Sequence, residues 1–363
     1  MLIGSAAGGA AGFVAAKSVA GGLDSRLSQL WSRVTTPVVT TTTNSNTQIF
    51  PIEAVRRPVY PGAFVNRSSS PLLPIIRKTG LKLTDPLMLS VERVQGYGVS
   101  VTSDGWIIAP SNVMSGSLNE LGVVWRSRVY AVSQAVRDRA NDLVFLKIDA
   151  TGLSVTDFVS PVDVVPGLAV WAETQPRQLR PEAMVAIDAR VTRDVVPSER
   201  LNRRFLVSLS DRMAKPGTAI WSENGRLIGL VMTVDGSGAS VLPTTAISST
   251  LSQVLGSRVI QHSALGVRVQ DVSSLVYEGV RQNWPEQGVI IRQIVSTSTA
   301  KFLQEGDVIE RMDRDAFDGI VDVGERLLDY RSGTNVTLQV IRKGVVMQIN
   351  VPLQATSTGE VLK

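Results

Sequence analysis

Hydrophobic residues between positions 61 and 259 fall in short, β-branched runs that are separated by Gly, Asp, Asn and Pro. The runs cover residues 87–92, 122–125, 143–148, 168–173, 184–191, 205–209 and 227–231. Helical periodicity begins only at residues 244–255, where Ile247, Leu251 and Val254 fall on one side of a helix. This pattern predicts an all-β barrel or sandwich that ends in an amphipathic helix.

A second pattern, at residues 264–354, mixes strands with one helix. Strand-like runs at 265–269 and 288–295 precede Leu-Gln-Glu-Gly-Asp-Val-Ile at 303–309. A helical stretch near 321–329 and alternating apolar residues at 333–344 follow. This order resembles a PDZ domain of the circularly permuted bacterial type. The resemblance implies an α+β domain, and residues 355–363 are expected to form a tail.

The N-terminal residues 1–23 are apolar and consist mainly of Ala and Gly, with Lys17 as their only charge. About twenty such residues span a hydrocarbon core, and the small residues spaced by four from Gly4 to Ala20 let membrane helices approach closely. We therefore expect a membrane anchor, while a cleaved signal segment and a soluble tail stay open. The Thr-rich residues 24–60 predict a linker or stalk.

Composition excludes several classes of site. The chain has 37 Lys and Arg against 32 Asp and Glu, and this mild excess is spread along the chain, so nucleic acid is not an expected partner. Cysteine is absent, which excludes disulfides, thiol nucleophiles and cysteine metal sites. His262 is the only histidine, which excludes a multi-histidine metal site. We expect neither a metal nor a cofactor.

Residues 98–114 predict a hairpin with a tight Asp104-Gly105 turn. The run Asp-Gly-Trp-Ile-Ile-Ala-Pro-Ser-Asn-Val-Met at 104–114 resembles the hairpin that carries the catalytic histidine in trypsin-like serine proteases of the HtrA/Deg family. With the PDZ-like module, the resemblance covers nearly the whole chain after residue 60. It implies a trypsin-like double six-stranded β-barrel over residues 61–259. The histidine position, however, holds Asn112, whose amide cannot take a proton from a serine hydroxyl.

The same resemblance locates the other two triad positions. The run Ala-Asn-Asp-Leu-Val-Phe-Leu-Lys-Ile at 140–148 keeps the orienting aspartate as Asp142. Without a base, we expect Asp142 to be a structural carboxylate that bonds backbone amides or the Asn112 side chain.

The nucleophile loop is shorter than the family pattern by three residues. Anchored on Pro216-Gly217, the serine position falls on Ala219; anchored on Gly225, it falls on Pro216. We prefer Ala219, and neither residue is a nucleophile. The geometry of an oxyanion hole built on this loop is therefore in doubt.

Other residues could replace the missing nucleophile or base only from positions outside the family's triad. Ser222 lies in a Ser-Glu-Asn-Gly turn, where local bonding is expected. A serine–lysine pair of Ser208 or Ser210 with Lys215 is conceivable, although ordinary strand and loop roles are expected. His262 lies between the two modules and is expected to be a linker or surface residue.

Peptide binding by the PDZ-like module would depend mainly on backbone groups. In this class a peptide C-terminus adds as a strand to a sheet edge, and amides of a short loop hold its carboxylate. The resemblance assigns the loop and an apolar pocket to Leu265, Gly266, Val267, Val269, Val323 and Leu327. The alternative is a groove that is empty or occluded by the chain itself.

The sequence thus predicts a mostly β protein whose function is recognition of peptide or protein C-termini. We expect a membrane-tethered, catalytically inactive HtrA-like homologue with its domains outside the cytoplasm, in the periplasm or at the cell surface. Two alternatives stay open: an active serine endopeptidase of envelope protein quality control with non-standard residues, and a structural oligomerisation scaffold. The resemblance implies a homo-oligomer such as a trimer, or a hetero-oligomer with active relatives.

Overall fold

The computed structural model describes residues 64, 69–78, 91–160, 163–190, 195–209, 211, 213–235, 238–275, 285–317, 322–357 and 359–362. The chain divides into two compact units, residues 1–58 and 59–363, and the described residues all belong to the second. The expected membrane segment 1–23 and stalk 24–60 lie outside the described residues. Within the described residues, no helix is long and apolar enough to cross a membrane.

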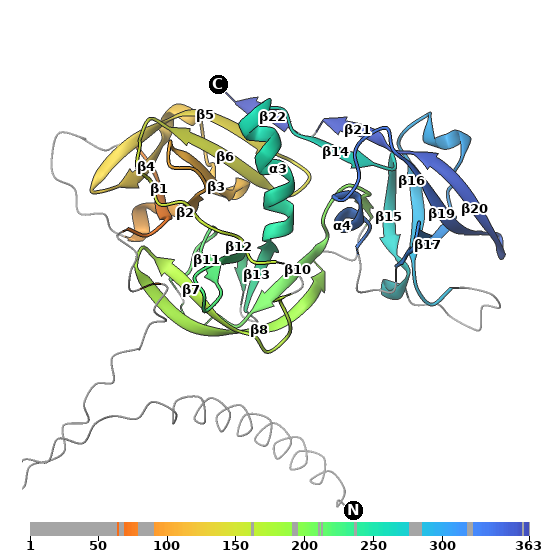
Figure 1. The fold of residues 1–363 in the computed structure, drawn as a ribbon, viewed down its shortest axis with the longest axis horizontal. Coiled ribbons are helices and arrows are strands. Elements are labelled where there is room, and N and C mark those ends of the chain that lie inside the picture. The colour runs from red at the N-terminus through yellow and green to blue at the C-terminus, as the bar shows by residue number, and fades with distance from the viewer. Residues whose placement is uncertain are drawn as a thin grey trace, which may run out of the picture. The chain divides into compact units, whose positions relative to one another are not determined.

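Six antiparallel strands form the first barrel (Figure 1). They are β1 (Leu72–Arg77), β2 (Val94–Ser100), β3 (Trp106–Pro110), β4 (Leu121–Trp125), β5 (Arg128–Asp138) and β6 (Leu143–Ile148). The order β5-β4-β1-β2-β3-β6 is closed by pairing of β5 with β6. Every residue of β3 is buried, because the strand is apolar along its whole length. The predicted hairpin is confirmed as β2 and β3.

The second barrel is also closed and six-stranded, in the order β10-β13-β12-β11-β7-β8. Its strands are β7 (Ala169–Gln175), β8 (Gln178–Arg190), β10 (Arg203–Val207), β11 (Ala219–Trp221), β12 (Leu227–Asp235) and β13 (Gly238–Pro243). The helix α3 (Thr244–Gly256) follows, and its Ala246, Ile247 and Val254 are fully buried in a cluster shared with barrel residues. The prediction of two six-stranded barrels followed by an amphipathic helix is confirmed.

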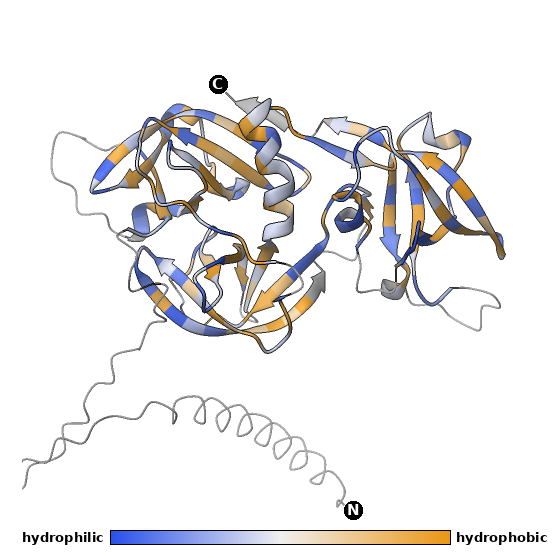
Figure 2. Cartoon of the chain, in the orientation of Figure 1, coloured by the Kyte–Doolittle hydropathy of each residue, from blue (hydrophilic) through white to orange (hydrophobic). Residues whose placement is uncertain are grey.

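The PDZ-like module is built on a sheet in the order β20-β19-β17-β16-β15-β9, with β18 paired to β17. Its own elements are β14 (Gln261–Ala264), β15 (Val267–Asp271), β16 (Val289–Ile294), β17 (Val308–Met312), β18 (Asp315–Ala316), α4 (Val323–Leu327), β19 (Asn335–Arg342), β20 (Val345–Pro352) and β21 (Gln354–Ser357). Figure 2 shows hydrophobic and hydrophilic residues alternating along β19 and β20. On β19 the alternation places Val336, Leu338 and Val340 in the core.

Short 3-10 helices complete the described elements: η1 (Val91–Arg93), η2 (Ser111–Val113), η3 (Leu118–Glu120), η5 (Val272–Ser274) and η6 (Thr299–Lys301).

Two strands cross the expected domain boundaries. The short strand β9 (Val196–Pro197) lies between β8 and β10 in sequence, but it pairs with β15 of the PDZ-like sheet. Residues expected to be a tail belong to β21, which pairs with β14, and to β22 (Gly359–Leu362), which pairs with β5 of the first barrel. The two modules are therefore joined by strand pairing as well as by the connecting chain.

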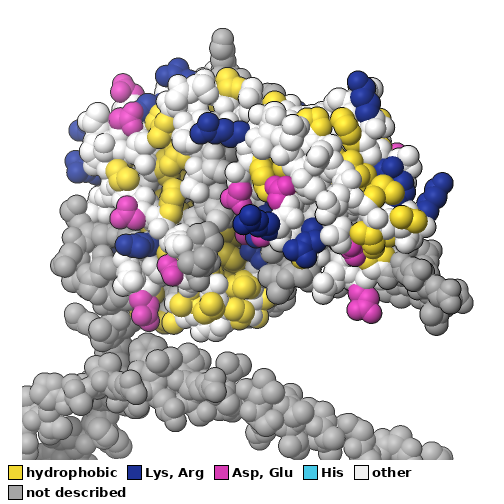
Figure 3. Space-filling model, turned by 45° about the vertical axis from the view of Figure 1, so that its right-hand side comes forward, with side chains coloured by type: hydrophobic (Ala, Val, Ile, Leu, Met, Phe, Trp, Pro, Cys, Tyr) yellow, Lys and Arg dark blue, Asp and Glu magenta, His cyan; other side chains and the backbone are white. Residues whose placement is uncertain are grey.

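His262 is a residue whose surroundings the sequence did not reveal. It lies in the connection between the modules, as expected, but it is not on the surface: only 5% of it is exposed. No histidine is visible on the face drawn in Figure 3. Its Nε2 lies 3.0 Å from Oδ1 of Asp138, a fully buried residue at the end of β5.

The Asp138 carboxylate accepts hydrogen bonds from several donors. Besides His262, it accepts hydrogen bonds from the Ala140 amide at 3.0 Å and from Asn141 Nδ2 at 2.9 Å. Burial by itself would raise the pKa of this carboxyl, but the bonds from His262, Asn141 and Ala140 lower the pKa overall. Asp138 thus connects the first barrel to the strand that leads into the PDZ-like module.

We predict that Asp138→Ala destabilises the protein by about 3 kcal/mol, because removing one partner of a buried polar cluster leaves the other donors unsatisfied. Chemical denaturation with fluorescence detection measures the effect. Asp149→Ala, at an exposed aspartate, is the control and should stay within about 0.5 kcal/mol of the parent chain. Equal stability of the two variants would contradict this role of Asp138.

The same carboxylate predicts a dependence of stability on pH. Because its pKa is lower in the folded than in the unfolded chain, its contribution is complete above the unfolded pKa of about 4. That contribution is lost as the pH falls through the lower folded pKa. The stability difference between the parent and Asp138→Ala should therefore shrink in acid.

Candidate functional site

Asn112 lies in η2, directly after β3, and is exposed. Its Nδ2 donates a hydrogen bond to the backbone oxygen of Met232, at 3.1 Å, on β12 of the second barrel. The residue in the histidine position thus reaches across to the other barrel as a hydrogen-bond donor. A side-chain amide in this place can donate and accept, but it cannot act as a general base.

Asp142 lies beside η2, because its backbone oxygen accepts a hydrogen bond from the Ser111 amide at 2.7 Å. Among the described residues, its side chain bonds neither backbone amides nor Asn112, which corrects the expectation for this residue. Instead Oδ2 lies 2.8 Å from Nη2 of Arg200. The carboxylate faces a guanidinium that the sequence analysis did not single out.

A second arginine gives Asp142 a further structural role. Arg204 is 2% exposed, and its Nη1 donates to the backbone oxygens of Leu201 and Arg203. The pKa of the Arg204 guanidinium is lowered to about 10, mainly by burial and also by the charge of Arg200, although the carboxylates of Asp142 and Asp322 raise it. Asp142 is therefore a counter-charge for two arginines.

Ala219 is the first residue of β11 and is completely buried. Its methyl group carries no nucleophile. In a trypsin-like site the oxyanion donors are the amides of the serine position and of the residue two places before it, here Ala219 and Gly217. An oxyanion hole needs donors aimed at an open position, but Gly217 N donates to Val231 O at 2.7 Å and so points into the protein's own backbone.

The 215–218 turn also packs directly against β2. Tyr97 N donates to Pro216 O at 2.9 Å, and Lys215 Nζ donates to Val94 O at 2.6 Å. Gly217 has φ of +86°, and a Cβ there would lie 1.7 Å from Tyr97 O. Only glycine fits this position, because any side chain would separate the turn from β2.

The three triad positions thus meet near one place. The 215–218 turn bonds to Val231, and Asn112 bonds to the next residue, Met232. Asp142 joins through the backbone of Ser111, the neighbour of Asn112. The structure therefore assembles the surroundings of a triad, while its side chains are an amide, a carboxylate paired with arginine, and a methyl group.

The other candidate nucleophiles have structural partners. Ser222 Oγ accepts from the Arg226 amide at 3.2 Å within its turn. Ser208 Oγ bonds to the neighbouring strand, accepting from the Ala183 amide at 3.0 Å, while Lys215 Nζ bonds to Val94. Ser210 lies outside the described residues. Among the residues that the structure describes, no group of three or more His, Asp and Glu side chains could hold a metal ion.

The residues expected to bind a peptide lie together in the PDZ-like module. Leu265, Val267, Val269, Val323 and Leu327 are buried in one cluster. Gly266 has φ of +69°, and its carbonyl accepts from the amides of Val295 and Ser296 at 2.9 and 3.0 Å. The edge of β15 is occupied by β9, whose Val196 packs against this cluster.

Sequence reasoning missed the 195–203 segment, which supplies β9, Arg200 and Arg203. A signal was present in Val195-Val196-Pro197, a short β-branched run that ends in proline. Proline is confined to edge strands within sheets, so the run was compatible with a strand at the end of a sheet.

Comparisons with known proteins match both modules. The PDZ domain family model matches residues 263–353. A "Probable periplasmic serine endoprotease DegP-like" of Bartonella henselae is 21% identical over 282 residues, which is 74% of this chain and 54% of that protein. A "Serine endoprotease DegS" of Haemophilus influenzae is 21% identical over 270 residues, 71% of this chain and 76% of that protein. The chain spans about half the length of the DegP-like relatives it matches.

Solved structures show the same fold. "HtrA-type protease AlgW with decapeptide" matches with a TM-score of 0.59 at 16% identity, covering 82% of this chain and 99% of that one. A serine endoprotease from Yersinia pestis matches with a TM-score of 0.54 at 14% identity, covering 83% of this chain and all of that one. The likeness extends over both barrels and the PDZ-like module.

We predict that Gly217→Ala destabilises the protein by more than about 2 kcal/mol, because the added methyl group meets the Tyr97 backbone and the positive φ adds strain. Gly152→Ala is the matched control, since Gly152 has φ of +83° and no atom of the described residues lies within 4 Å of an added Cβ. The control should lose about 1 kcal/mol from backbone strain alone. Equal losses on thermal denaturation would show that the contact with β2 contributes nothing.

Proposed function

We propose that this chain, an HtrA/DegP-like, trypsin-like serine protease homologue with a C-terminal PDZ domain, is catalytically inactive and acts by recognising peptide or protein C-termini. The PDZ domain is the proposed binding module, and the two barrels form the body that carries it. The observation that carries the proposal is the combination of Asn112 and Ala219 with a Gly217 amide that is already bonded to Val231 of β12.

Three separate losses support inactivity. Asn112 supplies no base, Ala219 supplies no nucleophile, and the amide of Gly217 donates to a backbone oxygen. In a serine protease of another fold, loss of the triad reduces kcat by about a millionfold, and the remaining catalysis comes from the oxyanion hole and substrate binding. The engaged Gly217 amide argues against that remainder as well.

Peptide recognition is supported by the parts of the PDZ domain that it would use. Gly266 stands in the left-handed region at the entry to β15, and the apolar residues expected to form the pocket share one buried cluster, contributed by β15, α4 and the loop before β15. Strand addition relies on backbone hydrogen bonds, so it does not need any of the lost catalytic residues.

We further propose that the folded domains lie outside the cytoplasm, since similar proteins are described as periplasmic endoproteases. Residues 1–23 would anchor the chain in a membrane, and the Thr-rich residues 24–60 would hold the domains away from its surface. Assembly into trimers, or with active relatives, belongs to the same proposal.

We predict that the purified chain neither cleaves an unfolded casein substrate nor reacts with a fluorophosphonate probe. The double variant Asn112→His, Ala219→Ser should remain inactive too, because Ala219 is buried and the Gly217 amide stays engaged. Labelling is read by in-gel fluorescence, with an active HtrA-type protease as the positive control. Labelling of the parent chain that one serine substitution abolishes would overturn the proposal.

We also predict that the chain binds peptides with apolar C-termini through their free carboxylate. The probe is a mixture of fluorescein-labelled decapeptides ending in Val, Leu, Ile or Phe, followed by fluorescence polarisation. The same peptides with C-terminal amides should bind about tenfold more weakly, because charge-assisted hydrogen bonds to backbone amides are lost. Equal binding of the two sets would argue against C-terminal recognition.

A further inference from the structure

The 195–203 segment follows the edge of the PDZ sheet. In β9, Val196 and Pro197 stand opposite Val269 and Arg268 of β15 in an antiparallel register. The Ser198 amide continues the ladder by donating to Val267 O at 3.0 Å, and Arg268 Nη2 donates to Val195 O at 3.0 Å. This is the edge of β15 to which an added peptide strand would have to bind.

Ser198 occupies the end of that groove. It is 1% exposed, and its Oγ accepts a hydrogen bond from the Leu265 amide at 3.1 Å. Leu265 belongs to the loop whose amides would hold a peptide carboxylate, as the resemblance to PDZ domains implies. A serine oxygen of the chain itself therefore takes the donor that a carboxylate oxygen would need.

The segment then passes over the start of α4. The amides of Asn202 and Arg203 both donate to Asp322 Oδ2, at 2.6 and 3.0 Å, and Asp322 also caps α4 through the Gly324 amide. A Cβ on Gly324 would lie 2.3 Å from Arg200 O, so the helix and the segment are in direct contact.

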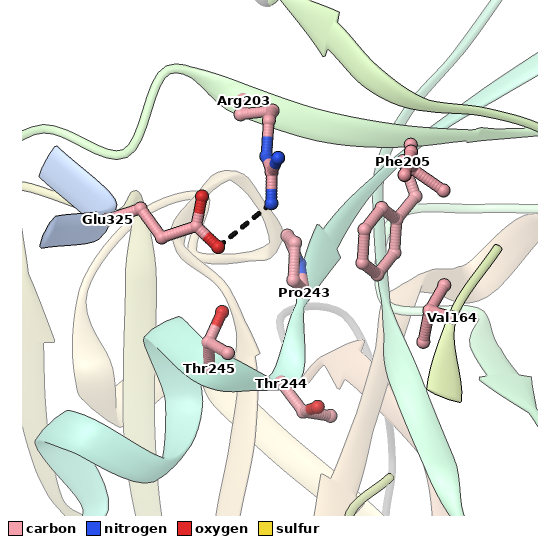
Figure 4. A pocket seen from close by; sticks show the side chains of 8 residues that line it. Val164, Arg203, Phe205, Pro243, Thr244, Thr245 and Glu325 are labelled. Carbon is pink, nitrogen blue, oxygen red and sulfur yellow. Dashed lines mark hydrogen bonds and ion pairs between the residues drawn. The ribbon is translucent and has the colours of Figure 1, made fainter. Parts of the chain in front are cut away.

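An ion pair closes this contact on the barrel side. Arg203 Nη2 lies 2.8 Å from Glu325 Oε1, and both side chains line a cavity of about 40 Å³ with Phe205 and Thr244 (Figure 4). The ion pair therefore joins the segment to α4 beside the second barrel.

Asp142 holds the segment from the first barrel. Arg200 lies in the turn after β9, since its amide donates to Pro197 O at 3.1 Å, and its guanidinium pairs with Asp142. The Asp142 side chain is 42% exposed, so this ion pair contributes only modestly to stability. It nevertheless gives the carboxylate in the retained triad position a structural role that does not depend on a catalytic histidine.

We infer that the 195–203 segment is an internal ligand of the PDZ groove, and that a peptide C-terminus binds only by displacing it. The inference rests on the proposed peptide-binding function of that groove. The internal strand is suited to displacement: β9 is two residues long, and Pro197 has no amide to donate. An extended peptide would offer an amide at most positions and a full carboxylate in place of Ser198 Oγ.

Val196→Asp tests the inference, because a charge at this position is unfavourable against the apolar cluster and expels the segment. In the full chain, the fluorescein-labelled decapeptide mixture ending in Val, Leu, Ile or Phe should bind at least about tenfold more tightly to this variant, since the fraction of open groove rises. Val185→Asp, at a valine on β8 that is 52% exposed, is the matched control and should bind like the parent chain.

A disulfide that holds the 195–203 segment in the groove tests the occluded state. The chain has no cysteine, so Pro197→Cys with Arg268→Cys creates a single possible disulfide between residues that stand opposite each other in the sheet. The oxidised variant should lose peptide binding, and reduction should restore it.

Hydrogen exchange reports occupancy of the groove without any peptide. The Leu265 amide should exchange at least about tenfold faster in Val196→Asp than in the parent chain, because its acceptor leaves with the segment.

The outcomes separate the inference from the proposed function. Equal peptide affinity of the parent, Val196→Asp and oxidised cysteine variants would overturn the internal ligand while leaving peptide binding intact. Absence of peptide binding to every variant, with faster Leu265 exchange in Val196→Asp, would overturn the proposed function and the competition that rests on it. Unchanged Leu265 exchange in a folded Val196→Asp protein would overturn the inference directly.

Discussion

Backbone hydrogen bonds at the junction of the two barrels determine what the rest of this molecule can do. The 215–218 turn is bonded on one side to Val231 of β12 and on the other to Tyr97 of β2. Buried amides and carbonyls must be paired, and here they are paired with each other. The bond from Tyr97 N to Pro216 O joins the turn to the first barrel, and the bond from Gly217 N to Val231 O, within the second barrel, occupies a donor that acyl-transfer chemistry would require. The packing of this turn and catalysis at it therefore make opposite demands on one short segment.

The sequence predicted the parts of the fold that depend on local pattern. The hairpin of β2 and β3 follows from two strand-like runs around the tight Asp104-Gly105 turn, and α3 follows from apolar residues spaced for a helix. The positions of Asn112, Asp142 and Ala219 near one another follow from resemblance to a known arrangement of strands, and the structure brings these positions together at Val231 and Met232.

Pairings between distant parts of the chain were not predictable in the same way. His262 is buried because of Asp138, a residue 124 positions earlier, and neither residue carries a local signal of the other. The strand β9 is too short to show a period, so its place in the PDZ sheet depends on the partner edge of β15. Asp142 was expected to be structural, but the arginines that make it so come from a segment with no recognisable motif.

The pairing of β22 with β5 has a consequence for the freedom of the PDZ domain. The chain enters that domain through β14 and returns from it to the first barrel through β22, so both ends are attached to the same body. A domain on one flexible linker can swing away, and the local concentration of its groove near any internal segment then falls with linker length. A domain held at two points stays close, and the effective concentration of the 195–203 segment at β15 remains high and independent of how dilute the protein is.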